Sequence, residues 1–177
     1  IGDNGAGKTT IFNLVFNLIK PDKGSIFING INTLGLSKEK LCQNVAILNQ
    51  NAFLIDISIR DYLSLSDSNI NKQKQICKEL NIHDFIMKLP KKYDTLLKNN
   101  CSTFSGGQKK LIQLAKIFLS NKEIILLDEA TSSLDKKMTK NVINLIKKNK
   151  NKTFIIITHK KEIMEISDRI VDINQYK

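Results

Sequence analysis

Cysteine is scarce in this sequence of 177 residues, and its three copies are widely spaced. Cys42, Cys77 and Cys101 form no C-x-x-C or C-x-x-H pair, so they indicate no metal site. An odd and scattered set also argues against a disulfide framework, and it is typical of free thiols in a reducing compartment.

Long apolar runs are missing as well. A helix that crosses a bilayer needs about 20 consecutive apolar residues, and the longest candidate, 11–19, is interrupted by Asn13 and Asn17. The sequence therefore predicts no membrane-spanning helix. It shows no signal-peptide pattern either. Because it opens with Ile1 and stops soon after the last predicted strand, we expect a fragment of a longer protein, truncated at both ends.

Only two prolines occur, Pro21 and Pro90, and each lies at a predicted element boundary. There is no internal repeat and no low-complexity linker. The length favours one domain, residues 1–177, with enough buried surface to fold.

Acidic residues are outnumbered by basic ones, 17 against 28, which gives a net charge of +11. Such a balance favours either an anionic partner (nucleotide phosphates, a membrane surface or nucleic acid) or a solvated, lysine-rich surface. No aromatic residues separate lysine pairs such as 91–92 and 147–148, as a groove for single strands would require. We therefore favour the solvated surface and expect no nucleic-acid partner.

Continuously apolar runs at 45–48, 124–127 and 154–157 predict strands that are buried on both faces, as in a parallel sheet. A further strand, 25–28, is predicted to enter a tight turn at Asn29-Gly30. Residues 169–173 predict the last strand.

Helical periodicity marks two segments clearly. One apolar face, in a helix beginning near Gly107, is formed by Leu111, Leu114, Ala115, Phe118 and Leu119. A second helix follows Asp135, a good N-cap. The stretch 57–120 is mainly helical in pattern, with strands on both sides of it. This order predicts an α/β core, residues 1–56 and 121–177, interrupted by a helical subdomain at 57–120.

The segment 2–9 matches the phosphate-loop pattern G-x-x-x-x-G-K-[ST] at every fixed position. Its glycines let backbone N–H groups point at phosphate oxygens, and a helix predicted from Lys8 to Ile19 adds its positive N-terminal dipole. Lys8 is expected to reach the β- and γ-phosphates, and Thr9 to ligate Mg²⁺. The predicted nucleotide-binding residues are Gly2, Asp3, Asn4, Gly5, Ala6, Gly7, Lys8, Thr9 and Thr10.

Candidate catalytic residues follow two of the apolar strands. The strand 124–127 ends in Asp128-Glu129, where Asp128 would hold Mg²⁺ through water and Glu129 would act as general base. The alternative is a solvent-facing acidic pair. His159 follows the strand 154–158, where it would contact the γ-phosphate or orient water; the alternative is a structural surface histidine.

The segment Phe104-Ser105-Gly106-Gly107-Gln108 closely resembles the LSGGQ signature of ABC ATPases, with Phe in the leading position. Residues 127–135 resemble the same family's Walker B motif and D-loop, and Gln50 and His159 match its Q-loop and H-loop. The resemblance covers nearly the whole chain. It implies a P-loop NTPase core with a mainly parallel sheet, an ABC-type helical subdomain and the remnant of an antiparallel β-subdomain.

The resemblance also implies a mechanism. Two cassettes pack head to tail around ATP and Mg²⁺, with Glu129, His159 and Gln50 as catalytic residues and with Thr9, Gln50 and Asp128 at the metal. The partner cassette contributes Ser105, Gly106, Gly107 and Gln108 to the γ-phosphate, and Asp135 helps to align the interface.

Segments 51–63 and 89–95 resemble exporters of peptides, lipids or drugs. The expected function is thus ATP hydrolysis that powers export, on the cytoplasmic face of a membrane, with a fused or separate transmembrane domain. A soluble ABC-type ATPase acting on ribosomes or nucleic acid and a non-hydrolysing regulatory cassette are the alternatives.

Two departures from the family pattern stand out. Residues 96–101 replace an acidic, glycine-containing segment, and Leu111 replaces the usual Arg. The family's adenine-stacking aromatic residue would lie before Ile1, outside this sequence.

Overall fold

The computed structural model describes residues 1–3, 5–51, 53–97 and 104–176. In chain order its helices and strands are α1 (Lys8–Val15), β1 (Phe27–Ile28), β2 (Ile31–Asn32), η1 (Thr33–Gly35), α2 (Lys38–Asn44), β3 (Val45–Leu48), α3 (Ile59–Ser64), α4 (Ile70–Glu79), α5 (His83–Lys88), η2 (Lys92–Asp94), α6 (Gly106–Leu119), β4 (Ile124–Asp128), α7 (Lys136–Lys148), β5 (Thr153–Ile157), α8 (Lys161–Met164) and η3 (Ile173–Tyr176).

The central sheet is parallel and has the order β3-β4-β5. Its register places Leu48 opposite Leu127 and Asp128 opposite Ile157, so the three strands end at nearly the same level. A separate antiparallel pair, β1 and β2, is joined through Asn29 and Gly30. Both turn residues have positive φ, 50° and 77°, as a two-residue hairpin requires. The parallel core and the small antiparallel sheet confirm the predicted α/β class.

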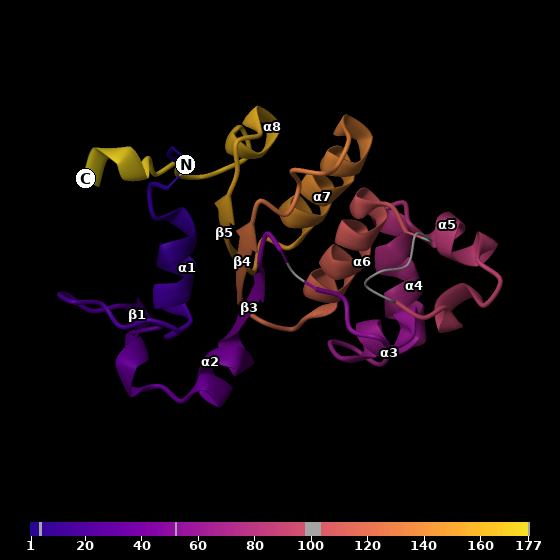
Figure 1. Cartoon of the computed structure of the whole chain (residues 1–177), viewed down its shortest axis with the longest axis horizontal. Helices are drawn as coiled ribbons and strands as arrows, with labels where there is room; N and C mark the ends of the chain where they lie inside the picture. Colours follow the sequence, from indigo (N-terminus) through magenta and orange to yellow (C-terminus); the bar gives the residue numbers. More distant parts are fainter. Residues whose placement is uncertain (4, 52, 98–103, 177) are drawn as a thin grey trace.

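Helices cover the parallel sheet on both sides. In Figure 1, α1 lies on one side, whereas α6 and α7 lie on the other and α3 to α5 lie beyond α6. Side-chain alternation along β4 gives the same arrangement: Leu126 packs with Phe12 of α1, whereas Ile125 and Leu127 belong to the cluster that includes α6. The chain is therefore layered, with the sheet in the middle.

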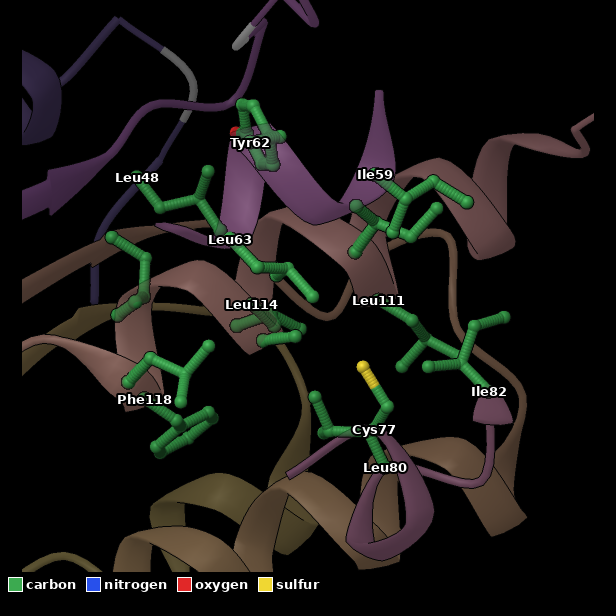
Figure 2. Close-up of a cluster of buried hydrophobic side chains, with 14 of the residues drawn as sticks. Leu48, Ile59, Tyr62, Leu63, Cys77, Leu80, Ile82, Leu111, Leu114 and Phe118 are labelled. Atoms are coloured by element: carbon green, nitrogen blue, oxygen red, sulfur yellow. The ribbon is translucent and has the colours of Figure 1, made fainter. Parts of the chain in front are cut away.

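The predicted stretch 57–120 contains α3, α4, α5 and α6, and their apolar faces meet in one cluster. Figure 2 shows Leu111 and Leu114 of α6 among Leu63 of α3 and Cys77 of α4. These four side chains have no exposed surface. Whether this segment is a subdomain with the predicted boundaries stays a prediction.

Two predicted helices begin where local chemistry indicates. Helix α6 begins at Gly106 after Ser105, and α7 begins at Lys136 after Asp135. The Asp135 carboxylate accepts a hydrogen bond from the Met138 N–H at 2.7 Å, so it is an N-cap as predicted. Of the three cysteines, Cys42 is exposed and Cys77 is buried, and both are free. The part of the divergent segment at 98–101, which includes Cys101, lies outside the described residues.

Helix α1 is shorter than predicted. It ends at Val15 instead of Ile19, because Asn17 adopts a left-handed conformation, with φ of 54°. The Leu18 N–H then donates to the Asn13 carbonyl at 2.8 Å, and the Asn17 N–H donates to the Leu14 carbonyl at 3.0 Å. This pair of bonds is a Schellman motif, which closes a helix.

Three strand predictions need correction. Residues 169–173 form no strand: the Ile1 amine donates to the Val171 carbonyl and the Ile173 N–H to the Ile1 carbonyl, and one residue makes no continuing ladder. The strand predicted at 25–28 is limited to Phe27–Ile28. Strand β5 is also not buried on both faces, because Ile155 is 43% exposed on the side of α1.

Among the described residues, no helix combines the length and the apolar character that crossing a membrane requires.

Candidate nucleotide site

The phosphate loop precedes α1, and its carbonyl groups bind the ammonium of its own lysine, Lys8. Gly5 and Gly7 have φ of 79° and 93°, a left-handed backbone that glycine adopts without strain. The Lys8 side chain is only 9% exposed, and its ammonium donates to the carbonyls of Gly2 at 2.7 Å and Asp3 at 2.8 Å. The loop thus holds a positive charge at the N-terminus of α1, where anions bind well. Asn4 lies outside the described residues, and Thr10 is exposed.

Thr9 connects the phosphate loop to the sheet. Its hydroxyl donates to the Oδ2 atom of Asp128 at 2.8 Å, although the two residues are 119 positions apart. Asp128 ends β4 and is 2% exposed. A hydroxyl beside a carboxylate offers the hard oxygen ligands that Mg²⁺ prefers, with the remaining ligands supplied by water and phosphate. This donor pair therefore fits Mg²⁺.

Gln50, Glu129 and His159 meet at the carboxyl ends of the three parallel strands. The Gln50 amide donates to Oε2 of Glu129 at 3.4 Å, and Nε2 of His159 lies 3.5 Å from Oε1. They meet because each follows its strand by one or two residues, and adjacent parallel strands end at the same edge. The structure places the Gln50 side chain on Glu129, and the predicted role of Gln50 at the metal stays a prediction.

The backbone at Glu129 is strained. Its φ of 45° lies in the left-handed region, which is costly for a residue with a side chain. Two contacts hold it there: the Glu129 N–H donates to the Ile157 carbonyl at 3.0 Å, and the Ser132 hydroxyl donates to the Glu129 carbonyl at 2.9 Å. Strain of this kind clusters at functional sites, which agrees with a catalytic Glu129.

Ser105 and Gln108 form a capping box at the start of α6. The Gln108 N–H donates to the Ser105 hydroxyl at 3.2 Å, and the Ser105 N–H donates to the Gln108 side chain at 2.8 Å. A hydroxyl both accepts and donates, so Ser105 keeps its proton for another acceptor. A Cβ on Gly107 would lie 3.3 Å from the Ser133 carbonyl oxygen, so the backbone here is closely packed. Phe104 is buried against Phe85, edge to face at 5.9 Å.

The predicted site residues fall into two groups that one chain does not bring together. The phosphate loop leads into α1, whereas Ser105 to Gln108 begin α6, on the opposite side of the sheet (Figure 1). Thr9, Gln50, Asp128, Glu129 and His159 gather at the strand ends with the phosphate loop.

Two lysines of the site have no counterpart in the sequence prediction. Lys110 is 8% exposed and donates from Nζ to the backbone carbonyl of Gln50 at 3.0 Å. Lys160 donates to the Leu134 carbonyl at 2.6 Å and to the Thr139 hydroxyl at 2.9 Å, which joins the His159 segment to the start of α7. For Lys110 one signal was available, since it lies one helical turn before Leu114 on a predicted apolar face.

An open depression of about 670 Å³ adjoins the hydrogen bond between Lys160 and the Leu134 carbonyl. It lies beside His159 on a face of the chain that also carries Asp135, and it is lined by Leu134, Asp135, Lys136, His159, Lys160, Lys161, Glu162 and Glu165.

A phosphate loop beside the acidic end of a parallel strand defines a P-loop nucleotide-binding domain. Residues 1–132 match the sequence profile of the ABC transporter family, and the chain belongs to that family. It is 36% identical over 180 residues to the β-(1→2)glucan export ATP-binding/permease protein NdvA of Bartonella bacilliformis, covering 99% of this chain and 30% of that protein. It is 35% identical over 182 residues to the mitochondrial iron–sulfur clusters transporter ABCB7 of Danio rerio, covering 100% of this chain and 24% of the relative.

A solved structure agrees with the sequence matches. A bacterial Atm1-family ABC exporter with ATP bound superposes with a TM-score of 0.88 at 29% identity, over 97% of this chain and 30% of that one. The chain therefore spans less than a third of the length of these relatives.

Proposed function

We propose that this chain is the ATP-hydrolysing cassette of an ABC exporter. The observation that carries the proposal is that a pair and a trio of side chains meet at the carboxyl ends of the parallel strands: the Thr9 hydroxyl bonds to Asp128, and Glu129 lies between Gln50 and His159. Proteins named as exporters and transporters among the relatives add support.

Each group has a role that follows from its chemistry. The phosphate-loop amides and Lys8 bind the phosphates, and Thr9 and Asp128 hold Mg²⁺. When bound, Mg²⁺ neutralises charge on the phosphate oxygens. Glu129 accepts the proton of the attacking water, while Gln50 and His159 hold its carboxylate from two sides.

A second cassette completes the site in this proposal. Ser105 to Gln108 lie across the sheet from their own phosphate loop, so they are available to another chain (Figure 1). The Ser105 hydroxyl can donate a hydrogen bond, and together with the N–H groups at the start of α6 it suits a γ-phosphate. We propose a head-to-tail dimer joined to a transmembrane domain, fused or separate, at the cytoplasmic face of the membrane.

Glu129→Gln in the full-length protein tests the catalytic role. Gln keeps the shape of the side chain but is not a base, so ATP binding should persist while kcat falls about 10²- to 10⁴-fold. ATP should then hold the two cassettes closed, which cross-linking between them detects. Glu39→Gln, an exposed carboxylate on α2, is the control and should hydrolyse normally. Hydrolysis at the wild-type rate by Glu129→Gln would show that another group is the base.

One observation favours a soluble ABC-type ATPase that acts on ribosomes or nucleic acid, namely the net charge of +11. That alternative predicts binding to RNA or DNA whose logarithm falls steeply with the logarithm of salt concentration, because several phosphates are neutralised. The exporter proposal predicts instead that the full-length protein is recovered with membranes and that salt washing does not release it.

A further inference from the structure

Lys110 occupies a position that apolar packing alone does not explain. It belongs to α6, two residues beyond Gln108, and only 8% of it is exposed. The three residues Leu111, Ile112 and Leu114, which follow it on the helix, have no exposed surface. An ammonium in such surroundings is costly unless a hydrogen bond compensates it. Burial accordingly lowers the pKa of Lys110, and the charge of Asp128 opposes that shift.

The compensating hydrogen bond connects Lys110 to the catalytic edge, which is our name for the carboxyl ends of the parallel strands where Gln50, Glu129 and His159 meet. The Lys110 ammonium donates to the backbone carbonyl of Gln50 at 3.0 Å, across 60 residues of sequence. Gln50 follows the end of β3 and is itself exposed. Its side chain meets Glu129 at 3.4 Å, a long hydrogen bond that a small shift of the backbone would break.

We propose that Lys110 is a positioning residue that holds the Gln50 backbone so that the Gln50 side chain stays on Glu129. This inference rests on the proposed ATPase function. Because α6 begins with Ser105 to Gln108, the same lysine ties the catalytic edge to the helix that presents these residues. A displacement of that helix is thereby passed to Gln50 through a direct contact.

The test compares Lys110→Met with a matched control in the full-length protein. Met keeps the length and apolar stem but donates no hydrogen bond, so kcat should fall about tenfold, with KM for ATP changed by about twofold at most. Lys116→Met is the control: this lysine lies on the same helix, half-buried over the Tyr62 ring at 4.8 Å. It should keep the wild-type kcat.

Two further variants separate positioning from a general effect on the fold. Lys110→Arg, which keeps a cationic donor, should recover most of the lost kcat. Lys110→Met in a Gln50→Ala background should have no further effect, because the side chain that it positions is already gone. The melting temperature of Lys110→Met should not fall, since a buried charge has been removed.

Several results would overturn the inference. A kcat for Lys110→Met equal to that of Lys116→Met would do so, as would additive losses with Gln50→Ala or a Lys110→Arg variant as slow as Lys110→Met. These outcomes are distinct from failure of the proposed function. In that case the wild-type protein does not hydrolyse ATP, or Glu129→Gln hydrolyses it normally.

Discussion

The two sides of the parallel sheet differ in how much they bury. Of the described residues, 26 buried ones form the cluster on the side of α6, whereas six form the cluster on the side of α1. Large apolar side chains are exposed in both parts of the chain: Ile11, Leu18, Ile19, Phe27, Ile31, Leu34 and Ile155 in or next to segments of the smaller cluster, and Phe53, Ile55, Leu65, Ile70, Met87 and Leu96 in or next to segments of the larger one. We call the side of the sheet with the larger cluster the thick side and the side with the smaller cluster the thin side.

The difference coincides with a division of the nucleotide site. Helix α1 carries the phosphate loop on the thin side, and α6 carries Ser105 to Gln108 on the thick side. The groups proposed to bind phosphate thus adjoin the small cluster, and the groups proposed to meet a second chain begin a helix of the larger one. Function and stability should therefore respond differently to changes on the two sides.

The largest expected contrast is functional. Lys8→Ala removes the buried ammonium of the phosphate loop and should weaken ATP binding about a hundredfold, because charged hydrogen bonds are lost. Ser105→Arg places bulk where the second cassette should close, so it should leave ATP binding intact and lower kcat about a hundredfold or more. Fluorescent-nucleotide titration and steady-state ATPase assays of the full-length protein measure both quantities. Equal losses of ATP affinity would show that one chain binds nucleotide with both groups.

The next contrast concerns stability, with the same substitution on each side. Leu111 on the thick side and Leu41 on the thin side are 0% and 1% exposed. Leu111→Ala should cost about 4 kcal/mol of unfolding free energy and Leu41→Ala about 2 kcal/mol, because the smaller cluster collapses more easily around a cavity. Urea denaturation of both variants measures the difference. Equal costs would mean that burial alone, and not the depth of packing, determines stability here.

Features carried by local patterns were predictable from the sequence. The phosphate loop, the parallel strands, α6 and the Asp135 cap each follow from residues that lie within one element. The meeting of Gln50, Glu129 and His159 at one edge also follows from parallel strands, although their roles remain predictions. The capping box was readable too, since Ser and Gln three positions apart before an apolar run form that pattern.

Features that depend on distant partners were not predictable. The bond between Lys110 and Gln50 joins residues 60 positions apart, and no local pattern contains it. The predicted strand at 169–173 failed for a related reason, because a strand needs a neighbour along its length. The early end of α1 depends on the left-handed Asn17, a conformation that asparagine permits but does not require.

A smaller effect on stability is expected at Glu129, which lies at the catalytic edge between the two faces of the sheet. Glu129→Gly removes the side chain from a left-handed position, so it should raise the free energy of unfolding by about 1 kcal/mol. It should also lower kcat at least as much as Glu129→Gln is expected to. Thermal and urea unfolding measure the gain, with Glu129→Gln as the control that keeps the strain. A destabilised Glu129→Gly variant would mean that the Glu129 contacts outweigh its backbone cost.

The smallest expected effect is electrostatic, within the thick side. Arg60 of α3 lies 2.8 Å from Asp94 of η2, and its guanidinium holds the pKa of that carboxyl below the usual 3.8. A lowered folded pKa stabilises the protein above the unfolded pKa, and this contribution is lost as pH falls through the folded value. Arg60→Gln should therefore be slightly less stable than wild type at neutral pH, with the difference vanishing on acidification. Asp94→Asn should show the same pH dependence, and the double variant should lose nothing more. A difference that persisted in acid would mean that Arg60 stabilises this side through its packed stem, as apolar residues do, and not through its charge.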